Sequence, residues 1–274
     1  MSIFNKILFF IILIIIPSVS GIIYGLVGLF VALSISLWIC FLLVIINADK
    51  FLLGLYKARP ARYGELSDIR NKILVLSKKH GVPAPSIYIS DLELPGSFII
   101  GSNVKKTSIV IPKRLFTLLK SDEFEAVLAH NIVQVDNTIR KRTSVALIAG
   151  AMTMYAYAIR WGAVFTGFGD INDPAPKLVG LFTIGLAAPP AATLIHSLPE
   201  DHYDAKAVTL LGNSGSLISA ISHLESNNVT GYPSLGFICL IDPQKENFFE
   251  NLFDVHPLRD TRIKKLTAKG EKND

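Results

Sequence analysis

The sequence predicts a mainly helical α+β membrane protein with a small antiparallel sheet and about four transmembrane helices in two hairpins. Half of the 274 residues are hydrophobic and only 18% are charged, a balance typical of membrane proteins. No charged residue occurs from Ile7 to Asn47. As a helix this run is roughly twice as long as a ~30 Å hydrocarbon core requires, so we expect two spans joined by a turn.

A second apolar pair predicts the other hairpin. Its members are residues 143–166 and 177–198, separated by the polar stretch 169–173. Arg160 and Trp161 suit a membrane interface. Two alternatives stay open: a cleaved signal peptide for the first span, and a buried helical hairpin of a soluble core for the second pair.

Basic residues flank the expected spans on one side, at Lys6, between 50 and 62, and at 140–142. The positive-inside rule therefore places both termini and the soluble segments on the cytosolic side of a cell membrane or inner membrane. The expected organisation is a hairpin over 1–50, a cytosolic domain in two parts over 51–142 and 199–268, a second hairpin over 143–198, and a tail over 269–274.

The net charge of +5 does not indicate a nucleic-acid partner, because much of the positive charge lies beside the spans, as membrane topology requires. Cys40 and Cys239 are too few for a disulfide framework. We expect both to be free thiols, which fits a reducing compartment.

The soluble part begins with an amphipathic helix over 65–80 that ends at Gly81. Three β-rich runs follow at 86–90, 97–100 and 107–111. Pro95-Gly96 and Gly101-Ser102-Asn103 separate them, and these are turn residues. The expected result is a small antiparallel sheet.

Two further helices are expected. Ser121 is a candidate N-cap, with Asp122 and Glu123 in the first turn, and the apolar stripe continues to Val135. Another helix is expected to begin near Pro199 and to end at Gly212-Asn213.

Four local patterns occur in an informative order. Residues 125–130 read like the approach to an H-E-x-x-H helix, and residues 96–101 are similar to an N-A-F-A-T-G strand. Glu200, Asp204 and residues 211–213 are similar to a segment that supplies a third zinc ligand, and residues 256–263 to an H-P-P-x-x-x-R-I ending. Together the chain resembles the HtpX family of membrane zinc peptidases, relatives of the CAAX prenyl protease. The resemblance covers about residues 1–268 and implies a zincin-like cytosolic domain.

The motif that should perform the chemistry is altered. Two histidines four residues apart on a helix bind one zinc ion, and the glutamate between them takes a proton from the bound water. This chain has His130, then Asn131 in place of the general base, and Gln134 in place of the second histidine. The third ligand that the resemblance implies, Glu200, is retained.

This degenerate site of His130, Gln134 and Glu200 has alternative interpretations. A functional one keeps His130 and Glu200 as zinc ligands and adds His202 or Asp136. The preferred one has His130 and Glu200 hydrogen-bonded to each other and to Gln134, with no catalytic residue, metal or cofactor; the remaining possibility is a weakly bound, non-catalytic metal.

Three functions follow. The leading hypothesis is a catalytically inactive pseudopeptidase that serves as a membrane-anchored scaffold, a client-binding protein or a subunit of a hetero-oligomeric membrane complex. Its partners would be the lipid bilayer and other membrane proteins or peptides. The others are an active zinc metalloendopeptidase in membrane protein quality control and a purely structural subunit with a closed groove. The groove implied by the resemblance is formed by Ser97, Phe98, Ile99, Ile100 and Gly101, whose strand edge suits an extended peptide.

Overall fold

The computed structural model describes residues 46–62, 64–148, 203–227 and 259–270, together with positions 229, 235 and 238–241 and scattered positions from 11 to 39. Residues 1–51 and 52–274 are separate compact units, and the candidate site lies in the second. The expected membrane spans fall almost entirely outside the described residues. Among the helices that are described, none has both the length and the apolar character needed to cross a membrane.

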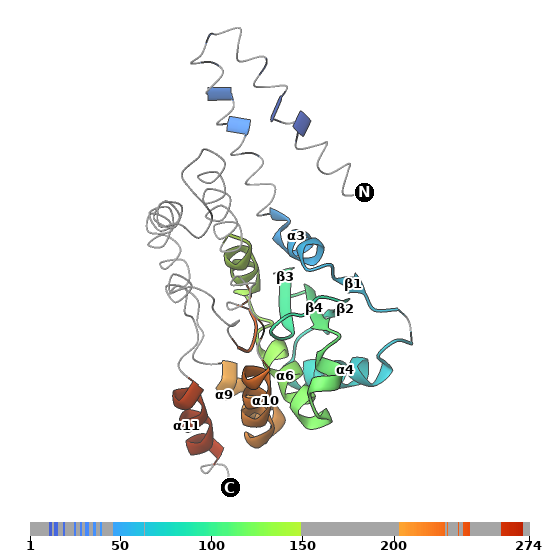
Figure 1. Ribbon diagram of the computed structural model, residues 1–274, viewed down its shortest axis with the longest axis vertical. Coiled ribbons are helices and arrows are strands. Elements are labelled where there is room, and N and C mark those ends of the chain that lie inside the picture. The colour runs from blue at the N-terminus through green and yellow to red at the C-terminus, as the bar shows by residue number, and fades with distance from the viewer. Residues whose placement is uncertain are drawn as a thin grey trace, which may run out of the picture. The chain divides into compact units, whose positions relative to one another are not determined.

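The sheet has four strands in the order β1-β2-β4-β3 (Figure 1). They are β1 (Arg59–Pro60), β2 (Ser86–Ser90), β3 (Phe98–Asn103) and β4 (Lys106–Pro112). The expectation of an antiparallel sheet was wrong for its central pair, because β2 and β4 are parallel whereas β1–β2 and β3–β4 are antiparallel. Residues 91–105 between β2 and β4 are long enough for the crossover that parallel neighbours require.

The turn expected at Gly101-Ser102-Asn103 was also misplaced. These residues continue β3, with an irregularity between Gly101 and Asn103, and Asn103 is paired with Lys106. The actual turn follows at residues 104 and 105, where the Asn103 side chain accepts a hydrogen bond from the Lys105 amide at 2.9 Å. Gly101 is needed for packing instead, since a Cβ there would lie 2.7 Å from the Lys106 carbonyl oxygen.

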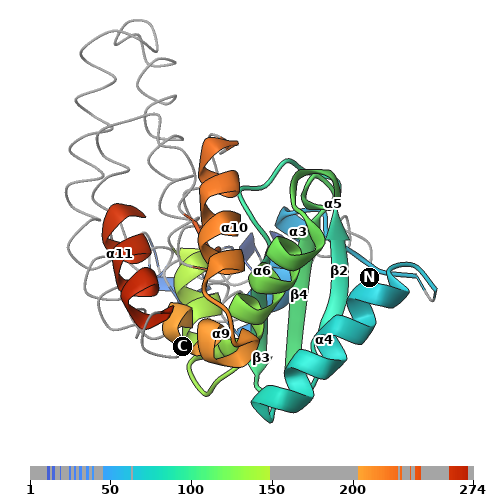
Figure 2. The same ribbon diagram turned by 90° about the horizontal axis from the view of Figure 1, so that it is seen from below.

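Alternate residues of the strands pack on opposite faces of the sheet, as the period of two requires. Ile87, Ile109 and Ile111 join the larger apolar core, which includes residues of α4 (Ser67–His80) and α6 (Ser121–Val133). Figure 2 shows these two helices over that face. Val110 belongs to the second core on the other face, with Phe98 and Ile100.

Residues 139–148 form one further helix, and five labelled helices remain. They are α3 (Ala48–Leu55), α5 (Leu115–Leu118), α9 (Tyr203–Leu211), α10 (Gly215–Ser226) and α11 (Arg259–Gly270). Helix α6 packs against α4, α9 and α10, so it lies at the centre of the domain. The expected helix ends are present, since Gly81 and Gly212 both have positive φ and follow α4 and α9.

The beginning of α6 differs from expectation, because Ser121 is the first helical residue and not its N-cap. At the N-terminal end of the helix, the Glu123 carboxylate instead accepts a hydrogen bond from the Lys120 backbone amide at 3.0 Å. The same carboxylate accepts from Ser219 at 2.6 Å and contacts His223 Nδ1 at 2.9 Å, both on α10. Burial alone would raise the pKa of Glu123, but the bonds from Ser219, Lys120 and His223 outweigh it and lower the pKa to about 2.

Replacement of Glu123 by glutamine is expected to destabilise the protein at neutral pH by about 1–3 kcal/mol, because charged hydrogen bonds at a buried helix end are lost. The folded pKa lies below the ordinary value of 4.5, so the carboxylate's contribution is present above pH 4.5 and is lost as the pH falls toward 2. Thermal unfolding in detergent measures both effects.

The variant should therefore show a shallower loss of stability than the wild type below pH 4.5. Glu125→Gln is the matched control, since Glu125 is on the same helix and forms a partly exposed ion pair with Lys72. Equal pH profiles for Glu123→Gln and the wild type would contradict this assignment.

Candidate functional site

Helix α6 brings the three altered motif positions together in the domain interior. His130 and Asn131 lie in its last turn, and Gln134 is the residue that ends it. The exposed fractions of their side chains are 3%, 0% and 4%. His130 and Gln134 are four residues apart and therefore face the same side, as the motif requires.

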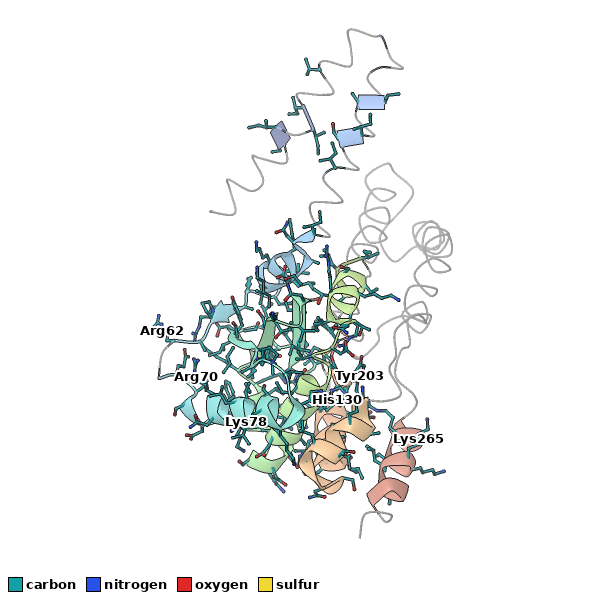
Figure 3. All side chains as sticks on the ribbon, turned by 180° about the vertical axis from the view of Figure 1, so that it is seen from behind. Arg62, Arg70, Lys78, His130, Tyr203 and Lys265 are labelled. Carbon is teal, nitrogen blue, oxygen red and sulfur yellow. The ribbon has the colours of Figure 1, made fainter. Side chains whose placement is uncertain are left out.

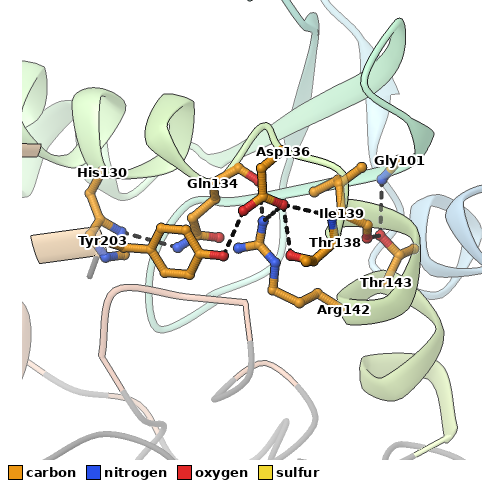
Figure 4. Close-up of polar contacts among 9 residues, drawn as sticks. All are labelled: Gly101, His130, Gln134, Asp136, Thr138, Ile139, Arg142, Thr143 and Tyr203. Carbon is orange, nitrogen blue, oxygen red and sulfur yellow. Dashed lines mark hydrogen bonds and ion pairs between the residues drawn. The ribbon is translucent and has the colours of Figure 1, made fainter. Parts of the chain in front are cut away.

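The imidazole of His130 has a polar neighbour at each nitrogen. Its Nδ1 lies 3.3 Å from Gln134 Nε2, so the expected contact between these two side chains is present (Figure 4). Its Nε2 lies 3.4 Å from Oδ1 of Asp204, which comes from the first turn of α9. Glu200 and His202, the other expected partners, lie outside the described residues.

Asp204 is itself bound by an arginine from the C-terminal helix. Arg262 on α11 donates from Nε and Nη2 to the two carboxylate oxygens, at 2.8 Å each. Its Nη1 donates to the Leu240 carbonyl, also at 2.8 Å. Arg262 is 5% exposed and Asp204 is 21% exposed, so the guanidinium is buried and the carboxylate is partly buried. The sequence motifs included both residues but did not predict that they pair.

Asn131, at the position where the resemblance expects the general base, has a structural role. Its amide nitrogen donates to Ser97 Oγ at 2.6 Å and to the Val127 carbonyl at 2.9 Å. Ser97 precedes β3, so this bond ties the altered helix to the strand of the expected groove. The Oδ1 atom of Asn131 and Oε1 of Gln134 are buried and have no hydrogen-bond partner within the described part of the chain.

A second polar network follows α6 directly, and it was not predicted from the sequence. Asp136 accepts hydrogen bonds from the Thr138 amide and hydroxyl, at 2.8 and 2.6 Å, and from Tyr203 at 2.8 Å. Arg142 contacts the same carboxylate at 3.3 Å, donates to the Gln134 carbonyl, and lies 4.6 Å from the Tyr203 ring centroid. Figure 3 shows His130 and Tyr203 close together, away from the outward Arg62, Arg70 and Lys78.

This network determines the charge of Asp136. Burial would raise its pKa, but the bonds from Thr138 and Tyr203 and the Arg142 charge outweigh it, so the pKa lies below the ordinary value. Burial raises the pKa of Tyr203. Asp136 is therefore an ionised carboxylate whose acceptor sites are occupied, which disfavours it as a replacement metal ligand.

The described residues do not fit a catalytic zinc ion. Such an ion needs about three protein ligands and an open position. No group of three His, Cys, Asp or Glu side chains with suitable placement occurs among the residues that the structure describes. Among the described residues near His130, the candidate ligands are Asp204, whose two oxygens are bound by Arg262, and the neutral amides of Asn131 and Gln134.

Replacement of Asp204 by asparagine is expected to lower stability by about 3 kcal/mol, because Arg262 would remain buried without its counter-charge. Thermal or urea unfolding in detergent would measure the loss. Glu65→Gln is the matched control: Glu65 also forms a bidentate pair, with Arg59, but both side chains are about one-third exposed. A loss for Asp204→Asn no larger than that for Glu65→Gln would contradict this role of the buried Arg262.

Comparisons with known proteins agree on one family. The model of peptidase family M48 matches residues 64–269. The chain is 29% identical to a "Protease HtpX homolog" of Desulfatibacillum aliphaticivorans over 231 residues, which are 81% of this chain and 74% of that one. It is 30% identical to a homolog of the same name from Desulforapulum autotrophicum, over 80% of this chain and 74% of that one.

A third relative with that name, from Methanocaldococcus jannaschii, is 28% identical over 88% of this chain and 92% of its own. Among solved structures, the crystal structure of S. mikatae Ste24p aligns with a TM-score of 0.47 at 16% identity, over 96% of this chain and 63% of that chain. The family match covers most of the described domain, and the chain belongs to peptidase family M48.

Proposed function

We propose that this chain is a catalytically inactive, membrane-anchored member of the M48 family that serves as a scaffold, a client-binding protein or a subunit of a membrane protein complex. The observation that supports this proposal is the hydrogen-bonded amide network at the motif positions. By the resemblance of the sequence, Asn131 and Gln134 stand at the positions of the family's general base and second zinc ligand.

The loss of the general base is a chemical argument. A neutral amide has no basic site that takes a proton from water near neutral pH. The Asn131 amide nitrogen is also committed to Ser97 and the Val127 carbonyl, so the side chain is fixed for packing and not for proton transfer. Water activation would require a different base, and Asp136, a nearby carboxylate, is held by Thr138, Tyr203 and Arg142.

The metal-ligand positions are altered as well as the position of the general base. Gln134 offers a neutral amide in place of an imidazole, and that amide contacts His130 Nδ1. Asp204 lies at the other imidazole nitrogen, so His130 already has partners on both sides. Two of the three expected ligands, His130 and Glu200, remain in the sequence.

The proposed setting is a cell or inner membrane with the soluble domain on the cytosolic side. The uncharged run from Ile7 to Asn47 supports a membrane anchor, and the basic residues at 50–62 and 140–142 support this orientation. Clients would be membrane proteins or extended peptides that contact Ser97–Gly101. No nucleic acid is proposed as a partner.

Proteolysis assays on the wild type and on His130→Ala test this function without requiring a repaired site. Both proteins are expected to leave unfolded casein intact in the presence of zinc, because neither has a general base. Cleavage by the wild type that is lost in His130→Ala would contradict the proposal and favour an active zinc metalloendopeptidase with a rebuilt site.

The double variant Asn131→Glu with Gln134→His should gain bound zinc relative to the wild type, because it restores the full motif. Elemental analysis of the purified proteins measures the gain, and thermal unfolding shows whether the variant is folded. The matched control is Asn131→Glu with Gln134→Asn, which restores the base without the second imidazole. Equal zinc in the wild type and the folded double variant would contradict the account of the lost ligand.

A further inference from the structure

The outer edge of β3 is covered by the protein itself. On its inner side β3 is paired with β4, and its outer side is where an extended peptide would add as a further strand. Yet every residue of the groove candidates, from Ser97 to Gly101, is buried. A strand that is open to a peptide exposes its edge, so other parts of this chain occupy that position.

One part is the short segment 238–241, which we call the inner segment. Its residue Cys239 forms an antiparallel bridge with Phe98, the first residue of β3. The Cys239 sulfur also lies 3.7 Å from the Gly96 carbonyl oxygen. At Cys239 the bridge has the antiparallel orientation that an incoming strand would adopt, and the neighbouring residues of the segment lie in a turn and bends.

The other end of the same edge is closed by a side chain. The Gly101 amide donates to Thr143 Oγ1 at 3.0 Å, and this hydroxyl donates in turn to the Ile139 carbonyl at 2.8 Å (Figure 4). The Gly101 amide of the candidate groove therefore already has an intramolecular partner. Phe98 and Gly101 lie near the two ends of the groove candidates, and both have intramolecular partners, Cys239 and Thr143.

The inner segment is also connected to the altered site. Arg262 donates to the Leu240 carbonyl and, through its other nitrogens, to Asp204. Asp204 in turn faces His130. A single buried arginine therefore fixes both the inner segment on β3 and the carboxylate beside the histidine.

The composition of the inner segment indicates what the edge accepts. Its four side chains are Ile238, Cys239, Leu240 and Ile241, and each is buried. None carries a charge. Ile238 and Cys239 share an apolar core with Phe98 and Ile100, whereas Leu240 and Ile241 belong to the larger core. Beside Phe98 the edge therefore suits aliphatic side chains of an extended, uncharged peptide.

We propose that the inner segment occupies the place of an extended aliphatic peptide on β3, and that a client of this composition binds there only when the segment is released. This inference rests on the proposed client-binding function and specifies its site and its ligand class. On binding, the client peptide would replace the backbone and apolar contacts of the inner segment with β3 by equivalent contacts of its own.

Gly96 offers a direct way to fix the segment in place. A Cβ built on Gly96 would lie 3.9 Å from the Cβ of Cys239 and meets no other atom of the described residues within 4 Å. This separation is within the usual range for a disulfide. Cys40 is the only other cysteine, so the Gly96→Cys variant would be made in a Cys40→Ser background. The matched control adds Cys239→Ser, which removes the partner thiol.

The first readout is whether mild oxidation joins residues 96 and 239, which peptide mapping by mass spectrometry measures. The second is photocrosslinking of a synthetic benzophenone peptide with the sequence Ile-Ser-Leu-Ile to residues 97–101. Crosslinking is expected for the reduced protein, lost after oxidation and restored by dithiothreitol. The control should crosslink equally in both conditions.

Three results would overturn the inference. In the first, the folded Gly96→Cys variant keeps two free thiols after oxidation, so the segment does not lie on β3. In the second, oxidised and reduced proteins crosslink equally. In the third, the disulfide forms but neither state crosslinks, so the segment is never released. Cleavage of casein by the wild type would instead overturn the proposed function and leave the disulfide result unaffected.

Discussion

The ion pair between the buried Arg262 and the partly buried Asp204 is the interaction on which the arrangement of the site depends. It joins α11 to α9, and the third nitrogen of the same guanidinium binds the Leu240 carbonyl. A planar guanidinium can form these bonds in fixed directions, which a lysine could not. Because Asp204 also faces His130, the pair determines what lies beside the only imidazole retained from the motif.

Burial explains why neutral amides are favourable at positions 131 and 134. Asn131 is completely buried, and an ionised carboxylate at that position would cost several kcal/mol unless a cation or strong donors compensated it. A neutral amide avoids this cost and still bonds to Ser97 and the Val127 carbonyl. Gln134 likewise contacts His130 without a second titratable ring in the interior. Both side chains are neutral, and each leaves one buried amide oxygen, Asn131 Oδ1 and Gln134 Oε1, without a hydrogen-bond partner among the described residues.

Sequence patterns predicted the local elements of the described domain well. The helix that ends at Gly81, the three main strands and the helix that contains His130 follow from periodicity and turn residues, which are local signals. The parallel pairing of β2 with β4 did not follow, because it depends on where the chain returns after residues 91–105. Ser121 was a reasonable N-cap by residue type, but Glu123 has better partners across the interface with α10.

The candidate site was also predicted only in part, because local sequence signals report some of its contacts and not the long-range ones. The positions of His130, Asn131 and Gln134 on one helix come from the sequence alone, as does the contact between His130 and Gln134. Long-range pairs such as Arg262 with Asp204, Tyr203 with Asp136 and Ser97 with Asn131 arise from tertiary packing, and no local signal reports them.

The most direct test of the central claim is the zinc content of the full-length protein, purified in detergent without chelators and measured by elemental analysis. The account predicts a zinc-to-protein ratio near zero, unchanged by His130→Ala. A ratio near unity that is lost in both His130→Ala and Glu200→Ala would contradict it, because these residues would then form a working metal site with a ligand that the amide network does not supply.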